Sequence, residues 1–228
     1  MKCVILAGGK GTRISELSKS IPKPMIKILG IPIITRIILH YHNFGFKEFI
    51  IAAGYKKQII INYFKSKKIK NVNIKVVDTG LNTMTGGRLK RLKKYLSNEN
   101  FMLTYGDGLS NVNIKNLLKF HNKNNKIATL TAVRPPARFG AVRISGNRVK
   151  YFKEKSKLDV GWINGGFFVF NHRIFDFING DKTFLEREPL QKICKLGELN
   201  AFKHEGFWQC MDTIRDKQII EETLKKIK

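Results

Sequence analysis

The sequence predicts a Rossmann-like α/β fold, in which a mostly parallel sheet carries helices on both faces. Short apolar runs alternate with segments of helical apolar spacing along the first half of the chain. This alternation is typical of parallel sheets that are covered on both sides. The length of 228 residues and the hydrophobic content of 43% suit one sizeable core, so we expect a single domain over residues 1–228.

The chain opens with an apolar run at residues 3–7, which predicts a buried strand, and a glycine-rich segment (GGKGTR, residues 8–13) follows. Glycines at the end of a strand present backbone N–H groups to phosphate. We expect positive φ within this turn, which glycine adopts without steric cost. Arg13 and Lys23 would add positive charge beside the same anion. The segment matches neither a Walker loop nor a dinucleotide fingerprint, so the alternatives are another kind of nucleotide loop and a plain tight turn.

The next elements continue the alternation of strand and helix. Helical apolar spacing predicts a helix over 33–44, which begins after Pro32 and ends before Gly45. A buried strand over 48–53, a helix over 58–64 and a strand over 73–77 are expected to follow. Ligands of such sheets bind at the carboxyl ends of strands, and we therefore expect the functional site at that edge.

The segment 80–87 follows the strand over 73–77 and opens a helix at about Arg88. Its small polar residues and two glycines suit a loop that hydrogen-bonds a flat base. The alternative is a helix whose N-cap is Thr85, with flexible glycines after it. Asn82 and Thr83 are candidate contacts of the base. Arg88 is a candidate to stack on a base or pair with an anion, although surface arginines are the commoner case.

An apolar strand over 101–105 ends at Gly106-Asp107-Gly108. A carboxylate between two glycines at a strand end is exposed to a ligand, and Mg²⁺ takes one or two carboxylates together with phosphate oxygens. The alternative is a simple turn aspartate. The expected partner is Asp212, whose own alternative is to cap a helix over 213–227.

The pattern changes between these two aspartates. Short, partly alternating runs occupy 128–133, 140–144 and 148–153, with Gly146-Asn147 as a hairpin turn. They predict a small antiparallel excursion at the edge of the parallel sheet. An apolar strand over 163–170 follows.

Four polar or aromatic residues in or after this excursion are candidate ligand contacts. Glu154 can accept hydrogen bonds from ligand hydroxyls such as those of a sugar, and Lys155 can pair with a phosphate. Neighbouring Glu and Lys residues more often form plain surface, which is the alternative. Trp162 and Trp208 either pack on the ring of such a ligand or belong to the core.

The net charge of +26 and the pI near 10.1 indicate affinity for polyanions. We interpret this charge as compositional, because lysine, isoleucine and asparagine are used heavily throughout the chain. No RNA-binding aromatic motif or zinc finger accompanies the charge, so we do not expect nucleic acid as a partner. No run reaches the roughly 18 apolar residues of a membrane span, and no signal-peptide core is seen, so no membrane partner is expected. Three separated cysteines fit reduced thiols in the cytoplasm.

Several motifs together resemble the family of sugar-1-phosphate nucleotidylyltransferases. They cover nearly the whole chain in the family's order: LAGGKGTR at 6–13, PKPM at 22–25, VDTG at 77–80, MTGGRLKR at 84–91, TYGDG at 104–108, INGGFF at 163–168, GFWQ at 206–209 and MDT at 211–213. The resemblance is to the branch that uses CTP and glucose 1-phosphate. It implies a nucleotide-diphospho-sugar transferase fold, Mg²⁺ as cofactor and a homo-oligomer.

The resemblance also assigns roles to the matching residues. It implies Asp107 and Asp212 as the Mg²⁺ ligands, and Lys23, Arg13 and Asp107 as catalytic residues. The implied nucleotide-binding residues are Leu6, Ala7, Gly8, Gly9, Lys10, Gly11, Thr12, Arg13, Lys23, Asn82, Thr85, Gly87, Arg88 and Gly106. The implied sugar-phosphate-binding residues are Glu154, Lys155, Asn164 and Gly165.

Several positions depart from the family's pattern. Ser156 and Cys210 stand where proline is usual, and Lys27 and Ile31 replace a glutamate and a lysine. The connection over 65–71 is shorter than in the family, which bears on the oligomer if that segment builds an interface. These departures leave two alternatives open. One is a related nucleotidylyltransferase that uses UTP or dTTP, or another sugar phosphate. The other is a non-catalytic polyanion-binding protein on the same fold, which predicts salt-sensitive nucleic-acid binding without pyrophosphate release.

Overall fold

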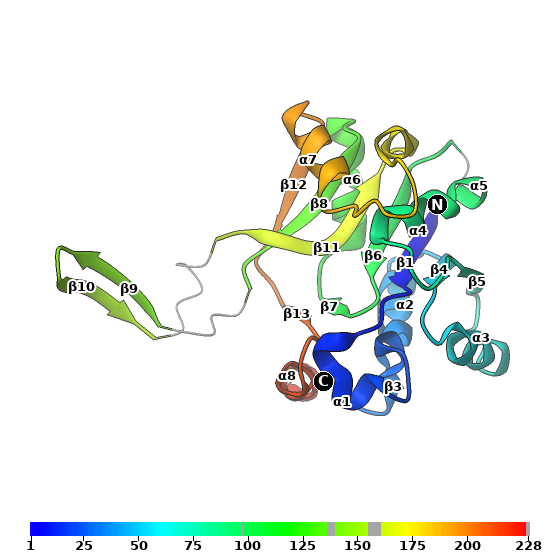
Figure 1. The fold of residues 1–228 in the computed structure, drawn as a ribbon, viewed down its shortest axis with the longest axis horizontal. Helices are drawn as coiled ribbons and strands as arrows, with labels where there is room; N and C mark the ends of the chain where they lie inside the picture. The colour runs from blue at the N-terminus through cyan, green and yellow to red at the C-terminus, as the bar shows by residue number, and fades with distance from the viewer. Residues whose placement is uncertain (97, 136–139, 155–160, 227–228) are drawn as a thin grey trace.

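The central element is a seven-stranded sheet that spans the body of the molecule (Figure 1). The structure is a computed structural model and describes residues 1–96, 98–135, 140–154 and 161–226. In spatial order the strands are β12 (Leu199–His204), β8 (Ala128–Val133), β11 (Ile163–Phe170), β6 (Phe101–Tyr105), β1 (Lys2–Ala7), β4 (Glu48–Ala53) and β5 (Asn73–Asp78).

The sheet is mostly parallel, as predicted. Only β11 runs antiparallel to its two neighbours, β6 and β8, and the other adjacent pairs of the sheet are parallel. The strands expected over 48–53, 101–105 and 163–170 are found with these bounds, and the one expected over 73–77 extends to Asp78. Residues 128–133 were expected in the antiparallel excursion. They form β8 within the main sheet instead, because β11 on one side and β12 on the other complete their hydrogen bonding.

Helices cover both faces of the sheet, which confirms the predicted fold class. Alternate side chains of β1 enter opposite cores: Cys3 and Ile5 lie in one cluster, and Val4 and Leu6 in the other. The first cluster includes residues of α2 (Ile33–Asn43), α3 (Lys57–Ser66), α6 (Ile114–Asn124) and α8 (Ile214–Lys226). The second includes residues of α4 (Thr85–Arg91), α5 (Lys93–Leu96) and α7 (Glu188–Lys195). No helix among the described residues is long and apolar enough to cross a membrane.

Short elements complete the chain, and most of them lie near strand ends. They are η1 (Thr12–Ile14), α1 (Ser15–Ser18), η2 (Lys23–Met25), β2 (Lys27–Ile28), β3 (Ile31–Pro32), β7 (Gly108–Ser110), η4 (His172–Phe177) and β13 (Trp208–Cys210). The sequence does not predict β7 or β13. These two strands pair with each other and connect distant parts of the chain.

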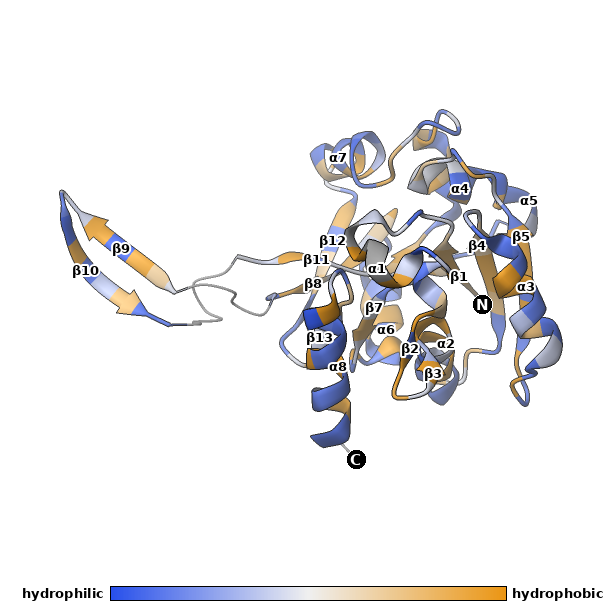
Figure 2. Cartoon of the chain, turned by 60° about the horizontal axis from the view of Figure 1, so that its bottom comes forward, coloured by the Kyte–Doolittle hydropathy of each residue, from blue (hydrophilic) through white to orange (hydrophobic). Residues whose placement is uncertain are grey.

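The antiparallel excursion is a hairpin formed by β9 (Ala141–Ser145) and β10 (Arg148–Lys153). It projects away from the body of the molecule (Figures 1 and 2). The expected turn at Gly146 is present, with φ of +56°. Ile144 and Phe152 are each 66% exposed, so the apolar side chains of this hairpin are not covered by the chain that carries them.

Candidate active site

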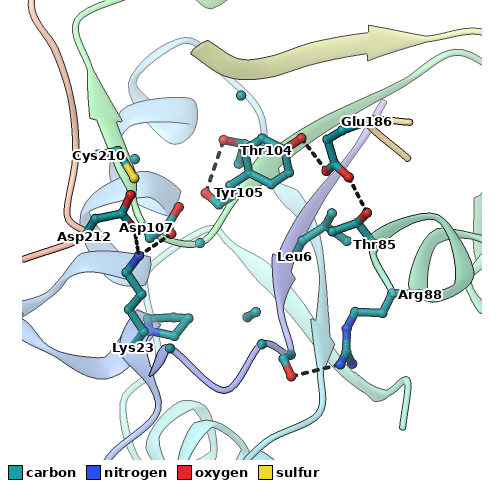
Figure 3. A pocket seen from close by; sticks show the side chains of 18 of the residues that line it. Leu6, Lys23, Thr85, Arg88, Thr104, Tyr105, Asp107, Glu186, Cys210 and Asp212 are labelled. Atoms are coloured by element: carbon teal, nitrogen blue, oxygen red, sulfur yellow. Dashed lines mark hydrogen bonds and ion pairs between the residues drawn. The ribbon is translucent and has the colours of Figure 1, made fainter. Parts of the chain in front are cut away.

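A pocket of about 610 Å³ opens at the carboxyl ends of β1 and β6. Its walls come from seven parts of the chain: the end of β1 with the loop after it, residues 23–24, the segment 83–88, the segment 104–108, residues of β11, Phe184 with Glu186, and residues of the segment 208–212. Two of its edges carry charged or polar clusters, which Figure 3 shows on opposite sides of Leu6. The pocket therefore lies where parallel sheets usually bind ligands.

The glycine-rich loop lies at one wall of the pocket, and its Gly8 and Gly11 carbonyls are hydrogen-bonded to the protein. The Gly8 carbonyl accepts hydrogen bonds from the N–H of Tyr55 (3.1 Å) and from Arg88 Nη2 (2.9 Å). Because a trans peptide places its C=O and N–H on opposite sides, the N–H of Gly9 faces away from Arg88. Gly11 has φ of +68°, as expected for a turn of this kind.

Arg88 supports this loop from beneath. Its side chain is buried, and it donates to Thr79 Oγ1 (2.8 Å) and to the carbonyls of Gly8 (2.9 Å) and Gly80 (2.7 Å). A Cβ at Gly8 would lie 2.0 Å from Arg88 Nη1, and one at Gly54 would lie 2.4 Å from it. Glycine is therefore required at residues 8 and 54 so that the guanidinium can reach the backbone. Arg88 lines the pocket, and its guanidinium is bonded to oxygen atoms of the protein.

The pairing of β7 with β13 brings two distant acidic residues together. Gly108 is aligned with Cys210 in this antiparallel pair, and the N–H of Met211 donates to the Asp107 carbonyl at 2.9 Å. Asp107 and Asp212 consequently lie next to each other at one edge of the pocket (Figure 3). The sequence predicted these residues as partners, and the short strand pairing is what places them.

Lys23 lies between the two carboxylates. Its Nζ is 2.7 Å from Asp107 Oδ2 and 2.6 Å from Asp212 Oδ1, and the residue is 7% exposed. Burial alone would lower the pKa of Lys23. The charge of Asp107 and the hydrogen bonds to Asp107 and Asp212 outweigh that effect and raise the pKa above the usual value of lysine. The ammonium group therefore stays charged and neutralises part of the acidic pair.

Asp212 is not the cap of the last helix. Thr213 and Asp216 form a reciprocal pair instead: the N–H of Thr213 donates to Asp216 Oδ2 (2.9 Å), and the N–H of Asp216 donates to Thr213 Oγ1 (3.1 Å). This arrangement is a capping box at the start of α8. The capping alternative considered for Asp212 is thus wrong, and its carboxylate is directed to Lys23.

The acidic pair fits a divalent cation. Carboxylate oxygens of Asp107 and Asp212 and the Sγ of Cys210 all lie within 4.8 Å of one another. The Lys23 ammonium already places one positive charge among these groups. Oxygen ligands of this type suit Mg²⁺. Burial, followed by the charge of Asp107, raises the pKa of the Cys210 thiol.

The opposite edge of the pocket, called the hydroxyl edge from here on, is held by hydrogen bonds that two hydroxyl groups donate to a carboxylate. The hydroxyl of Tyr105 donates to Glu186 Oε1 (2.6 Å), and that of Thr85 donates to Glu186 Oε2 (2.6 Å) (Figure 3). Asn164 Nδ2 lies 3.5 Å from the Tyr105 hydroxyl. The N-cap of α4 is Met84, so the capping alternative for Thr85 is wrong, and the Thr85 hydroxyl donates to Glu186 instead.

Glu186 was missed by the sequence reading. It lies in the irregular segment before α7, where no motif or periodicity points to it. The only available signal was a pair of glutamates beside Pro189, and that signal is too common to single out one residue.

Most predicted site residues line the pocket, and several do not. Those that line it are Leu6, Ala7, Gly8, Gly9, Gly11, Thr12, Lys23, Thr85, Arg88, Gly106, Asp107, Asn164, Gly165 and Asp212. Lys10 and Asn82 are exposed outside the lining, and Gly87 packs against the backbone of Asp181.

The predicted sugar-binding residues of the hairpin region are not among those that line the pocket. Glu154 is exposed just after β10, and Lys155 lies outside the described residues, as does the side chain of Arg13. The two tryptophans separate clearly. Trp208 lines the pocket and donates from Nε1 to the Gly165 carbonyl at 2.7 Å. Trp162 instead packs against Arg134, whose Cζ lies over the indole ring at 4.6 Å from the ring centre.

Comparison with known proteins agrees with this geometry. A family model described as nucleotidyl transferase matches residues 2–213. The glucose-1-phosphate cytidylyltransferase of Salmonella typhi is 46% identical over 248 aligned positions, which cover 99% of this chain and 96% of that protein. A probable glucose-1-phosphate cytidylyltransferase of Bacillus subtilis is 38% identical, with 95% and 93% covered. The crystal structure of HddC from Yersinia pseudotuberculosis is 26% identical, covers 98% of this chain and 99% of that one, and has a TM-score of 0.79. Since the family model spans almost the whole chain and these relatives match it from end to end, the chain belongs to the nucleotidyl transferase family.

Proposed function

We propose that this nucleotidyltransferase joins CTP to α-D-glucose 1-phosphate, which yields CDP-glucose and pyrophosphate. The observation that carries the proposal is the 46% identity to a glucose-1-phosphate cytidylyltransferase over 99% of the chain. The pocket supports it, because a glycine loop and a Lys23–Asp107–Asp212 cluster meet at the same edge of the sheet. A related enzyme that uses UTP or dTTP is the alternative.

The reaction needs little from the protein beyond position and charge. An oxygen of the sugar phosphate attacks the α-phosphorus of CTP, and the bond from that phosphorus to the bridging oxygen of pyrophosphate breaks in line. The nucleophile is already anionic, so no strong base is required. The protein has to hold two mutually repelling anions in line and neutralise the charge that develops between them.

The charged edge of the pocket would meet this requirement. Asp107 and Asp212 would hold Mg²⁺, which supplies electrostatic stabilisation of phosphate oxygens when it is bound. Lys23 would leave one of its carboxylate partners and neutralise phosphate charge at the reaction centre. Arg13 would bind the departing pyrophosphate.

The other residues of the pocket would bind and orient the two substrates. The N–H groups of the glycine loop would hold the phosphates of CTP, and the segment 83–88 would contact the nucleotide base. Asn164 and Gly165 would contact glucose 1-phosphate from the opposite wall. We assign Glu154 and Lys155 to the same substrate, as the family resemblance implies.

The test is a panel that measures pyrophosphate release. CTP, UTP, dTTP and GTP are each combined with glucose 1-phosphate, mannose 1-phosphate and galactose 1-phosphate, with Mg²⁺ and with EDTA. The proposal expects the highest kcat/KM for CTP with glucose 1-phosphate, and no release in EDTA. A higher kcat/KM with another base would replace CTP in the proposal while leaving the transfer chemistry in place. No release with any pair would reject the proposal.

We also infer a homo-oligomer that works in the cytoplasm. The exposed apolar side chains of the β9–β10 hairpin support the assembly, because Val142, Ile144 and Phe152 are each more than half exposed. The free cysteines support a reducing compartment. Light scattering on wild-type protein and on an Ile144→Lys, Phe152→Lys double variant tests the oligomer. A monomeric wild-type protein would contradict it.

A further inference from the structure

Cys210 adds a sulfur atom to the acidic edge of the pocket. It is the last residue of β13, and its alignment with Gly108 fixes it beside Asp107. Its Sγ and the carboxylate oxygens of Asp107 and Asp212 lie within 4.8 Å of one another. Figure 3 shows the sulfur next to the carboxylate group of Asp212, above the Lys23 ammonium. Three potential ligand atoms of two chemical kinds therefore share one small volume.

This donor set differs from one made of oxygen alone. Carboxylate oxygens are preferred by Mg²⁺ and Mn²⁺, whereas a thiolate selects softer ions such as Zn²⁺, Co²⁺ and Cd²⁺. Zinc readily takes mixed cysteine and carboxylate ligands. The two carboxylates would bind a cation without the sulfur. The sulfur would therefore mainly alter the selectivity of the site among divalent ions.

The structure itself shows that a cation is stable among these groups. The Lys23 ammonium is within 2.7 Å of both carboxylates, although it is almost fully buried. A nucleotide phosphate is a competing partner for this ammonium. When Lys23 turns toward a phosphate, the two carboxylates lose the cation that neutralises them. A divalent ion can then take the place of the ammonium group beside the carboxylates and the sulfur.

We propose that Cys210 makes this cation site thiophilic, so that Zn²⁺, Co²⁺ or Cd²⁺ binds to Asp107, Asp212 and Cys210 together and competes with Mg²⁺. The inference rests on the proposed function, in which Asp107 and Asp212 hold the catalytic cation. On coordination the Cys210 thiol gives its proton to the buffer, and its sulfur becomes the third ligand.

Cobalt is the probe, because Co²⁺ bound to a thiolate absorbs in the near ultraviolet and Co²⁺ bound only to oxygen does not. The full chain is titrated with Co²⁺ in the presence of CTP, as wild type, Cys210→Ser and Cys194→Ser. Cys194 is an exposed free cysteine on α7 and is the matched control. We expect the sulfur band in wild type and Cys194→Ser and its loss in Cys210→Ser. The Co²⁺ affinity of Cys210→Ser should fall by about tenfold or more, since even partners of metal ligands are worth that much.

A zinc competition assay gives the second readout. Zn²⁺ added to the Mg²⁺-driven reaction should inhibit wild type, and Cys210→Ser should need about tenfold more Zn²⁺ for the same fractional inhibition. If Cys210→Ser does not fold, the Cys194→Ser protein still tests the inference. Its remaining thiols are Cys210 and Cys3, and Cys3 is buried in the sheet, so a cobalt–sulfur band in this variant would come from Cys210.

Failure of this inference can be told from failure of the proposed function. Mn²⁺ binding, measured by electron paramagnetic resonance, reports on the carboxylates without requiring sulfur. Mn²⁺ binding with no cobalt–sulfur band in wild type would overturn the role of Cys210 alone. Absence of both signals would overturn the cation site itself, and with it the proposed function.

Discussion

The two edges of the pocket hold their carboxylates in different ways. At the charged edge, the Lys23 ammonium links Asp107 and Asp212. At the hydroxyl edge, the hydroxyls of Tyr105 and Thr85 donate to Glu186. Burial, with Glu186 nearby, raises the pKa of Tyr105, so its hydroxyl keeps the proton that it donates.

This difference separates the tasks that the two edges can perform. An ammonium between two carboxylates can exchange its partners for phosphate and a metal ion, because each of its bonds joins charged groups. A carboxylate held by two hydroxyls keeps its position, and its remaining lone pairs can accept hydrogen bonds from a ligand. We expect the charged edge to govern the chemical step and the hydroxyl edge to govern binding and orientation.

The largest effect is expected from the charged edge. Asp107→Asn keeps the size of the side chain but removes one charge of the pair, and it should lower kcat by about 10²–10³-fold, as for single electrostatic groups in other enzymes. The control is Asp78→Asn at the end of β5, where the carboxylate pairs with Lys57 at the surface. Steady-state pyrophosphate release measures both variants. A kcat of Asp107→Asn within a few-fold of the wild-type value would remove Asp107 from the reaction.

Lys23→Met should separate catalysis from metal binding. Turnover should fall by about 10²-fold because phosphate charge is no longer neutralised. Mn²⁺ binding to the protein without nucleotide should become about tenfold tighter, since a positive charge within 3 Å of both carboxylates has been removed. Paramagnetic resonance measures the affinity. Weaker Mn²⁺ binding in the variant would show that Lys23 does not occupy the cation's place.

The sequence predicted the charged edge far better than the hydroxyl edge. Asp107 lies between glycines at a strand end, and Lys23 lies between two prolines, so local signals and the family resemblance marked both. What brings Asp107 to Asp212 is the pairing of β7 with β13, two strands of three residues each, and elements this short show no periodicity.

Glu186 and Arg88 show why the rest of the site could not be predicted. Glu186 lies in an irregular segment, and its partners Thr85 and Tyr105 come from positions 101 and 81 residues away. Arg88 donates to backbone carbonyls of separate loops. Every residue has a backbone carbonyl, so the sequence does not indicate which of them accept these bonds. Contacts of both kinds are fixed by tertiary packing, and so they become visible only in the structure.

Arg88 shows how the glycine-rich loop and the segment after β5 depend on one side chain. Arg88→Met keeps much of the buried volume, but the Gly80 carbonyl loses its guanidinium donor and the Gly8 carbonyl keeps only the N–H of Tyr55. The free energy of unfolding should fall by about 2 kcal/mol. Arg91→Met, at the last residue of α4 and on its exposed side, removes an ion pair with Asp181 at the surface. Its effect should be much smaller because solvent screens that pair. Urea unfolding compares the two, and equal losses would show that Arg88 does not support the loop.

Glu186→Gln tests the hydroxyl edge and should give the smallest effect. The amide keeps the shape of the side chain, but it has one acceptor oxygen for two donating hydroxyls, so either Tyr105 or Thr85 loses its partner. One lost hydrogen bond of this kind corresponds to about a tenfold fall in kcat/KM. If this edge governs binding, KM rises and kcat changes little, opposite to Asp107→Asn. Glu188→Gln, at the start of α7 and paired with Lys192 at the surface, is the control. A fall in kcat with unchanged KM for Glu186→Gln would mean that both edges act on the chemical step, and the division between them would no longer hold.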